Sequence, residues 1–498
     1  MKVGRVITAE EQAARAHAQQ ILEEARAQAR QILDGARAQA GQVERDAERV
    51  AAQAGHARAS SSGDDEAITL PGVGAAGAAA VPPGRVEEVT GLVVRATVPG
   101  VALGEIVRVD RRGAEPLVAE VVGFRGEQAV LLPLGELAGI APACAVWRTG
   151  APLSIAVGDQ ILSRVLDGIG RPIDGGPPLE GETWAVDRPA PAALARPPIS
   201  APQPTGVRAI DTMLTLGRGQ RVGLFAGAGV GKSTLLGQIA RGAAADVIVV
   251  CQVGERGREL AELLGDELAP SRGRTVTVCA TSDAPPLVRL RAVHVATAIA
   301  EWFRDRRGAH VLLLCDSLTR VARAQREVGL SAGEPPARHG YPPSVFALLP
   351  RLVERAGATR EGTITALYTV LVAGNDHDEP IADEVRSLVD GHVVLDRRLA
   401  QRGHFPPVDV VQSVSRLMPR VVDARHAAAA ARLRTRLAVY EEHRDLVVLG
   451  AYQTGRDAAV DAAIAAYPAI ERHLQQARDE TADWDRSLES LLTLAGPR

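Results

Sequence analysis

The sequence RVGLFAGAGVGKST at residues 221–234 determines how most of this chain folds. Its apolar start predicts a β-strand, its glycine-rich middle predicts a tight turn, and the LLGQIARGA that follows has helical periodicity. A strand, turn and helix in this order form a phosphate-binding loop (P-loop). Glycine lets backbone N–H groups surround an anion, and the N-terminus of the helix favours negative charge there. The alternative, an ordinary glycine turn that precedes a lysine, leaves the strand and helix on either side unexplained.

The residues of this loop predict how a nucleoside triphosphate is held. Lys232 would reach the β- and γ-phosphates, and the Ser233 hydroxyl would hold Mg²⁺. The pattern G-x-x-x-x-G-K-[ST] is met except at its first position, where Ala226 is still small. The predicted phosphate-binding residues are Gly227, Ala228, Gly229, Val230, Gly231, Lys232, Ser233 and Thr234.

Composition limits the classes of partner and compartment. The chain has 498 residues, and its 57 Lys and Arg against 60 Asp and Glu give no global basic field for nucleic acid. Aromatic residues make up only 3%, which argues against base-stacking surfaces. The four cysteines are far apart, three of them in apolar strand-like runs, and are interpreted as reduced core residues. Without a signal-peptide core or an 18-residue apolar run, a cytoplasmic protein is expected.

The N-terminal part is predicted to be a helical arm. Residues 1–55 contain the eleven-residue repeat EEQAARAHAQQ, ILEEARAQARQ, ILDGARAQAGQ and VERDAERVAAQ, which is rich in helix formers. A period of eleven residues indicates a straight or right-handed helix that packs on another helix. The alternative is a solvated single helix of low stability. Residues 56–84, rich in Ser, Gly, Ala and Pro, predict a flexible linker.

The rest of the chain is predicted to form three domains. Short alternating runs predict an antiparallel β-barrel over 85–152. Alternating strands and helices predict an α/β nucleotide-binding domain over 153–418, and an alanine-rich helical domain follows over 419–498. The strands expected in the α/β domain are 221–226, 247–253, 275–280, 311–316, 363–371 and 392–396. The helices expected there are 233–242, 257–268, 286–307, 318–328 and 344–356.

Charged residues outside the loop complete the predicted site. Asp316 ends the apolar run VLLLCD, expected beside the loop strand, where a carboxylate holds water ligands of Mg²⁺; the alternative is a cap of the next helix. Glu255 follows another apolar run at the edge where α/β sheets bind ligands, and would polarise the attacking water. Arg256 would pair with Glu255 or with phosphate. Arg416, in QSVSRLMP, is either functional or an ordinary surface arginine.

Residues 85–475 closely resemble the cytoplasmic ATPases of type III secretion systems, which are relatives of the F- and V-type rotary ATPase subunits. The resemblance is carried by LSRVLDGIGRPIDG, VGERGREL, LLLCDSLTRVARAQREVGLSAGEPP, EPIADEVRSLVDGHVVL and FPPVDVVQSVSRLMP, in family order. It implies a RecA-like P-loop core of the α/β class with an N-terminal β-barrel and a C-terminal helical domain. It also implies a homohexamer with active sites between subunits.

The resemblance assigns ATP and Mg²⁺ as ligands and gives residues their roles. Lys232 and Ser233 bind phosphate and Mg²⁺, and Asp316 lies on the Mg²⁺ side. Glu255 is the catalytic carboxylate, with Arg256 as its neighbouring cation. Phe405, in place of the family's usual tyrosine, would lie against adenine. Arg416 would be the arginine finger given to the neighbouring subunit, a role worth roughly 10³–10⁵ in rate.

The family's activity is ATP hydrolysis that releases export cargo from chaperones towards a membrane export gate. The implied partners are stator and central-stalk proteins, chaperone–cargo complexes and, through the gate, the inner face of the membrane, with no nucleic acid. The arm resembles the start of the stator protein that binds this ATPase, which favours an injectisome over a flagellar enzyme and indicates a fusion. The alternatives are an F/V-type rotary subunit and a hexameric nucleic-acid translocase.

Three residues depart from the family pattern. Ala373 and Asn375 lie where an acidic stretch is usual, and His339 stands in place of an arginine. None of the three is an assigned catalytic residue, so the departures bear on interface details.

Overall fold

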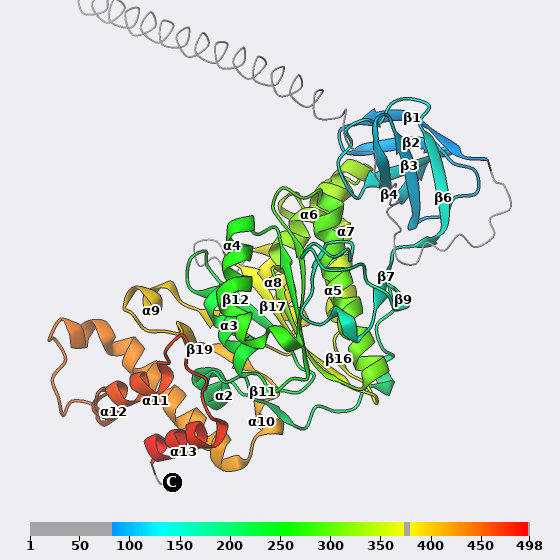
Figure 1. Ribbon diagram of the computed structural model, residues 1–498. Helices are drawn as coiled ribbons and strands as arrows, with labels where there is room; N and C mark the ends of the chain where they lie inside the picture. The colour runs from blue at the N-terminus through cyan, green and yellow to red at the C-terminus, as the bar shows by residue number, and fades with distance from the viewer. Residues whose placement is uncertain (1–81, 373–378, 497–498) are drawn as a thin grey trace, which may run out of the picture. The chain divides into compact units, whose positions relative to one another are not determined.

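The computed structural model describes residues 82–372 and 379–496 (Figure 1). The predicted arm over 1–55, nearly all of the linker over 56–84, and both Ala373 and Asn375 lie outside the described residues, so those predictions stay open. In the described ranges, no helix has the length and apolarity needed to cross a membrane.

The N-terminal described segment confirms the predicted β-barrel. Its strands close in the order β1-β2-β5-β4-β3-β6, so no edge is left unpaired. Val94, Val107 and Leu131 are fully buried inside it, because alternate residues of each strand face the interior. The strand bounds are β1 Gly84–Thr90, β2 Val93–Thr97, β3 Glu105–Arg111, β4 Ala114–Arg125, β5 Gln128–Pro133 and β6 Ala145–Pro152.

A large, mostly parallel sheet forms the centre of the nucleotide-binding part. Its strand order is β19-β18-β12-β17-β15-β13-β14-β8, with β19 antiparallel to β18 at one edge. The bounds are β8 Val165–Asp167, β12 Arg221–Ala226, β13 Val247–Val253, β14 Thr275–Ala280, β15 His310–Asp316, β17 Thr363–Leu371, β18 Gly391–Leu395 and β19 Val408–Ser415. Smaller pieces are β7 Ser154–Val157, β9 Glu182–Ala185, β10 Pro202–Gln203, β11 Leu216–Gly217 and β16 Gly357–Ala358.

All six predicted strands are present in this sheet, whereas its two edge strands were not predicted. β8 has only three residues, too few to establish a pattern. β19 carries polar residues and an irregular register with β18, since an edge strand buries less of its surface.

Helices cover both faces of the sheet and create two apolar cores. On β12, Phe225 packs into the core formed with α5–α8, whereas Val222 and Leu224 pack into the core formed with α2, α3 and α11–α13. This division follows from the alternation of side chains along a strand. Figure 1 shows α3 and α5 on opposite sides of the strands. The helices are α2 Arg208–Met213, α3 Lys232–Gly242, α4 Gly257–Glu262, α5 Pro286–Arg307, α6 Leu318–Ala332, α7 Pro343–Val353, α8 Pro380–Leu388, α9 Arg397–Gln401, α10 Met418–Val421, α11 Ala424–Val448, α12 Ala458–Leu474 and α13 Trp484–Ala495.

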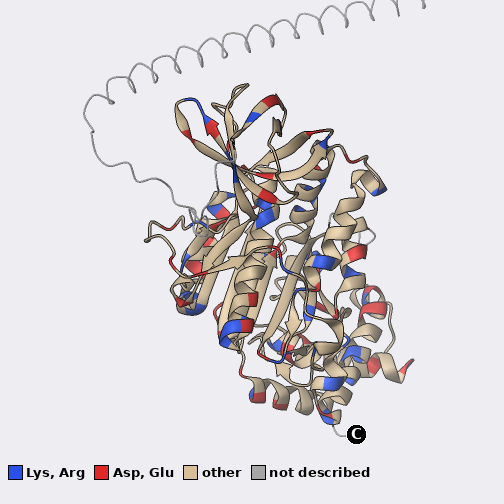
Figure 2. Ribbon diagram, turned by 90° about the vertical axis from the view of Figure 1, so that its right-hand side faces the viewer, with Lys and Arg blue, Asp and Glu red and all other residues tan. Residues whose placement is uncertain are grey.

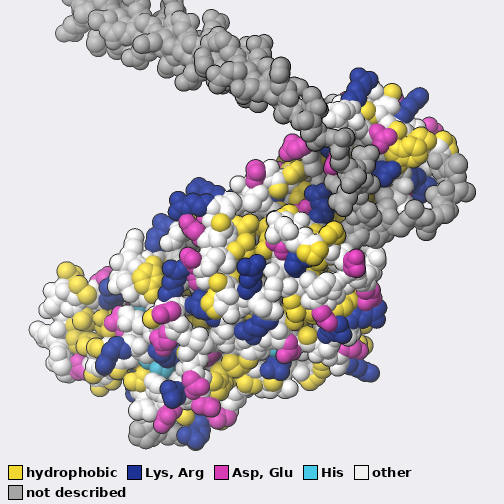
Figure 3. All heavy atoms as spheres, in the orientation of Figure 1, with side chains coloured by type: hydrophobic (Ala, Val, Ile, Leu, Met, Phe, Trp, Pro, Cys, Tyr) yellow, Lys and Arg dark blue, Asp and Glu magenta, His cyan; other side chains and the backbone are white. Residues whose placement is uncertain are grey.

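The structure shows how the charged residues and the cysteines are distributed. Basic and acidic residues are interspersed along the described elements (Figure 2), and the face drawn in Figure 3 carries side chains of both signs. All four cysteines are free; Cys251, Cys279 and Cys315 are buried, which confirms them as core residues, whereas Cys144 is only partly buried. Within the described ranges, no cluster of three or more His, Cys, Asp or Glu residues is arranged to hold a metal ion.

Candidate active site

The predicted P-loop joins β12 to α3. Gly229 and Gly231 have φ angles of 74° and 101°, values in the left-handed region where a side chain would be strained. The loop is braced on both sides: Val372 N–H donates to the Ala226 carbonyl at 3.0 Å, and Arg397 Nη2 donates to the Ala228 carbonyl at 3.0 Å. The backbone is therefore preshaped around the start of α3, where the helix favours an anion.

Lys232, the first residue of α3, is the centre of the site. Its amino group is hydrogen-bonded to the Asp316 carboxylate, and its Nζ lies 3.5 Å from Glu255 Oε1. The lysine side chain is only 10% exposed, so its positive charge is compensated by these two carboxylates. Three of the predicted site residues, from three separate elements, thus meet at one point.

Asp316 ends β15, but the sequence expectation that β15 lies beside β12 is wrong. β17 pairs with both strands and so lies between them in the sheet, an order that no local sequence pattern specifies. Thr369 on β17 consequently donates its hydroxyl to Asp316 Oδ1 at 2.7 Å. The N-terminal cap of α6 is Ser317, whose side chain accepts from Arg320 N–H, so the structure rejects the alternative that Asp316 caps this helix.

Glu255 lies just beyond β13, and its partner is Arg320 on α6. Arg320 Nη2 is 3.0 Å from Glu255 Oε2. Gly254, with a φ of 70°, makes this approach possible, since a Cβ there would lie 2.9 Å from Arg320 Cδ. The predicted pairing of Glu255 with Arg256 is wrong for this structure. Arg256 is 83% exposed and its nearest carboxylate belongs to Glu259, at 3.9 Å, because its side chain leaves the site at the start of α4.

The surroundings of Glu255 raise the pKa of its carboxyl group. Burial is the main cause, because it disfavours the charged form, and a hydrogen bond with Glu259 adds to the increase. Lys232 and Arg320 act in the opposite direction by stabilising the carboxylate. A carboxylate with a raised pKa is a stronger proton acceptor near neutral pH than an ordinary glutamate.

Phe405 and the P-loop border one pocket of about 590 Å³. Phe405 is about half exposed, at 49%, and its backbone carbonyl accepts from Gln476 N–H at 2.8 Å. The pocket combines apolar and polar side chains in the manner of small-molecule sites. Its lining residues include Gly231, Thr234, Leu235, Gln238, Phe405, Pro406, Pro407 and Gln476.

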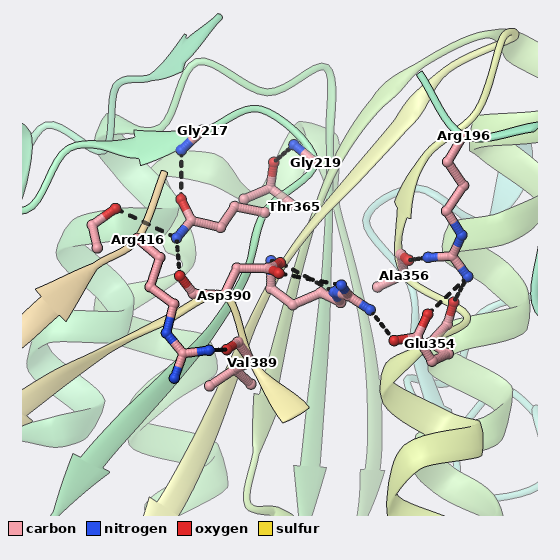
Figure 4. Close-up of polar contacts among 12 residues, drawn as sticks. Arg196, Gly217, Gly219, Glu354, Ala356, Thr365, Val389, Asp390 and Arg416 are labelled. Atoms are coloured by element: carbon pink, nitrogen blue, oxygen red, sulfur yellow. Dashed lines mark hydrogen bonds and ion pairs between the residues drawn. The ribbon is translucent and has the colours of Figure 1, made fainter. Parts of the chain in front are cut away.

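Arg416 is not brought to this site. Its N–H donates to the Asp390 carbonyl at 3.1 Å and its Nη1 to the Val389 carbonyl at 3.4 Å, at the start of β18 (Figure 4). Asp390 is in turn bonded to Arg221, the first residue of β12. The P-loop follows the last residue of β12, and a rise of about 3.3 Å per residue separates the two ends by roughly 15–20 Å. That span exceeds the reach of an arginine side chain.

Sequence reasoning missed Arg320 and Thr369. Arg320 had a usable signal, since it lies one helical turn beyond Asp316, in the first turn of α6. Thr369 had none, because a threonine within an apolar strand is ordinary until the strand order is known. His339, one of the residues that depart from the family pattern, lies in an exposed turn with a φ of 51°.

Comparison with known proteins identifies the family. Residues 206–415 match the nucleotide-binding domain of the ATP synthase alpha/beta family, and residues 86–150 match its beta-barrel domain. Residues 422–493 match the C-terminal domain of the T3SS EscN ATPase.

Individual relatives agree with these matches. The flagellum-specific ATP synthase of Bacillus subtilis is 47% identical over 417 residues, covering 83% of this chain and 95% of that protein. The type 3 secretion system ATPase of Xanthomonas euvesicatoria is 48% identical over 414 residues, covering 82% and 93%. The assembled ATPase EscN of enteropathogenic E. coli, solved with its central stalk EscO, is 42% identical with a TM-score of 0.77, covering 83% of this chain and 100% of that one. The chain therefore belongs to the family of flagellar and type III secretion export ATPases.

Proposed function

We propose that this chain hydrolyses ATP with Mg²⁺ at sites shared by neighbouring subunits of a homohexamer, and that hydrolysis drives chaperone release and protein export. One observation carries the proposal: Lys232, Asp316 and Glu255 converge on the P-loop, while Arg416 lies beyond reach of that same loop. A ring supplies what one subunit lacks, because head-to-tail interfaces bring the Arg416 edge of one subunit to the P-loop edge of the next.

The residues at the P-loop fit a magnesium nucleotide. Mg²⁺ keeps several waters and is held by substrate phosphates plus one or two protein oxygens, so it needs no dense cluster of protein ligands. The Ser233 hydroxyl and the Asp316 carboxylate are the oxygens that would hold it. When bound, Mg²⁺ would offset the negative charge of the phosphates. Phe405 and the pocket beside it would receive the adenine.

The chain's own residues then have separate tasks. The amino group of Lys232, which contacts two carboxylates in the described structure, would exchange them for phosphate oxygens. Glu255 would orient the attacking water and accept its proton, with Arg320 fixing the carboxylate at 3.0 Å. Arg416 of the neighbouring subunit would stabilise the charge that develops on the transferred phosphoryl group.

Arg320 provides a test of the role of Glu255 through pH dependence. Arg320 lowers the pKa of Glu255, so Arg320→Gln should raise that pKa further. A proton acceptor must be unprotonated, so the acidic limb of the kcat profile should move to higher pH in R320Q. The conservative variant R320K retains the charge and should keep the limb near its parental position. An unmoved limb in R320Q, or a shift to lower pH, would show that Glu255 is not the group that titrates.

Membership of this family supports a proposal about the partners of the chain. EscN was solved in complex with a central stalk, and we propose a stalk protein, a stator and chaperone–cargo complexes as partners here, with peripheral association at the membrane through the export gate. The flagellar and type 3 secretion relatives are 47% and 48% identical, so the preference for an injectisome rests on the arm alone.

The rate of ATP hydrolysis with added partners separates the export function from a nucleic-acid translocase. We expect purified chaperone–cargo complexes to stimulate the ATPase and RNA to have no effect, since the face drawn in Figure 3 interleaves both charges. Stimulation by RNA alone would favour the translocase. Copurification with a complete ATP synthase, and with no secretion components, would favour a rotary subunit.

A further inference from the structure

The strand that ends in the P-loop begins in a bidentate ion pair. Arg221 Nε and Nη2 lie 3.1 and 3.2 Å from the two carboxylate oxygens of Asp390. The Arg221 backbone N–H donates to the same carboxylate at 3.0 Å, and Asp390 N–H donates back to the Arg221 carbonyl at 2.9 Å. Four hydrogen bonds between two residues fix the segment before β18 against the first residue of β12.

Two carbonyl groups of that segment bind Arg416, one at its backbone N–H and the other at its guanidinium. The Asp390 carbonyl accepts from the Arg416 backbone N–H at 3.1 Å, and the Val389 carbonyl accepts from its guanidinium at 3.4 Å (Figure 4). The buried side chain of Gln220 adds a third connection, because its Nε2 lies 3.3 Å from the Asp390 carbonyl and 3.4 Å from Ser415 Oγ. Arg416 thus extends from backbone that the Asp390 side chain anchors.

Arg221 is itself held from its other side. Its Nη1 pairs with Glu354, directly after α7, and Glu354 lies 3.0 Å from Arg196 Nη2. The Arg221 and Asp390 side chains are only 17% and 26% exposed. A partly buried, bidentate pair keeps its geometry better than the flexible ion pairs of an open surface.

We propose that Arg221 and Asp390 are positioning residues for Arg416. The inference rests on the proposed function, in which Arg416 acts at the neighbouring subunit's site. Asp390 touches no nucleotide in this account; it fixes the backbone from which the finger projects. β12 runs from Arg221 to the P-loop. One strand therefore connects the nucleotide site of a subunit with the residue that anchors Arg416, which acts at the site of the neighbouring subunit.

Mixed rings of full-length chains test this inference, because they separate the two roles of a subunit. An Arg416→Ala chain keeps a P-loop and lacks the finger, whereas a Lys232→Ala chain keeps the finger and lacks a working P-loop. At 1:1 random mixing, about one interface in four pairs an intact P-loop with an intact finger, so ATPase activity should partly return. Asp390→Asn is then placed either in the finger donor (K232A/D390N) or in the finger acceptor (R416A/D390N).

The inference predicts a one-sided loss. D390N in the donor should lower the recovered activity by roughly 10-fold or more, the scale on which small misplacements of a catalytic group act. D390N in the acceptor should leave the recovered activity near that of the parent mixture, which also shows that the variant folds and assembles. Asp174→Asn is the matched control, since Asp174 forms a bidentate pair with Arg164 at 2.8 and 2.9 Å, away from Arg416. In either chain, D174N should have no such effect.

Other outcomes overturn the inference in distinguishable ways. Equal losses from D390N in donor and acceptor would assign the pair a general structural role. Recovery unaffected by D390N in both chains would show that Arg416 needs no anchor. If R416A and K232A chains form mixed rings without any recovery, the shared site itself is refuted, and the positioning role with it.

Discussion

Replacing Glu255 with Gln is expected to lower kcat for ATP hydrolysis by about 10²–10⁴-fold, the usual contribution of a positioned proton acceptor. The amide keeps the size of the side chain but cannot accept a proton from water. It also loses the charge that pairs with Lys232 and Arg320. Nucleotide binding, which depends on the P-loop and the pocket beside Phe405, should change by only a few-fold.

Steady-state hydrolysis and binding of a fluorescent ATP analogue measure the two effects separately. Glu262→Gln is the matched control, because Glu262 ends α4, the helix that begins two residues after Glu255, is 56% exposed and pairs with Arg258 away from Lys232. E262Q should hydrolyse ATP at the parental rate. If E255Q also does so, Glu255 is not the catalytic carboxylate.

Replacing Arg416 with Ala is expected to cost about 10³–10⁵ in kcat, as removal of an arginine finger does in other phosphoryl-transfer enzymes. The reason is electrostatic, since the guanidinium stabilises charge that is largest in the transition state. Because Arg416 lies at the opposite end of β12 from its own P-loop, the substitution should leave ATP binding to that P-loop intact.

The conservative variant Arg416→Lys separates charge from geometry. Lysine restores the positive charge without the planar fork, so R416K should recover only a small part of the lost rate. Melting temperature and ring size should stay at parental values in both variants. A parental rate in R416A would make Arg416 the ordinary surface arginine that its sequence context allowed.

The central fold could be predicted because the pattern of an apolar strand followed by a periodic helix recurs along the chain. Strands such as β12 and β15 are continuous apolar runs, as expected for parallel strands covered on both faces, and each leads into a periodic helix. The spatial order of the strands has no such local signal. The insertion of β17 between β12 and β15 depends on packing across the whole sheet. This insertion places Thr369 where its hydroxyl donates a hydrogen bond to Asp316.

The site was predictable where residues follow a motif along the chain. The P-loop, Asp316 and Glu255 each stand directly at the end of a recognisable strand, and the structure brings them together at Lys232. The pairing of Glu255 with Arg320 was missed, although Arg320 lies one helical turn beyond Asp316, because Arg256 is the arginine next to Glu255 in the sequence. Only the structure shows that Gly254 leaves room for the Arg320 side chain and that Arg256 is exposed at the start of α4.

The role of Arg416 could not be predicted from local sequence either. Sequence alone left it as either a finger or a surface residue, and a single subunit leaves it without a phosphate to contact. Its fixed place at the far edge of the sheet acquires a catalytic meaning only when a second subunit is present.

ATP hydrolysis per subunit, measured against protein concentration with particle size determined on the same samples, tests the shared site most directly. We expect specific activity to rise in step with the fraction of chains in rings and to be close to zero in samples that are monomeric. Full specific activity in a sample shown to be monomeric would contradict a shared site, because one chain would then hold a complete active site.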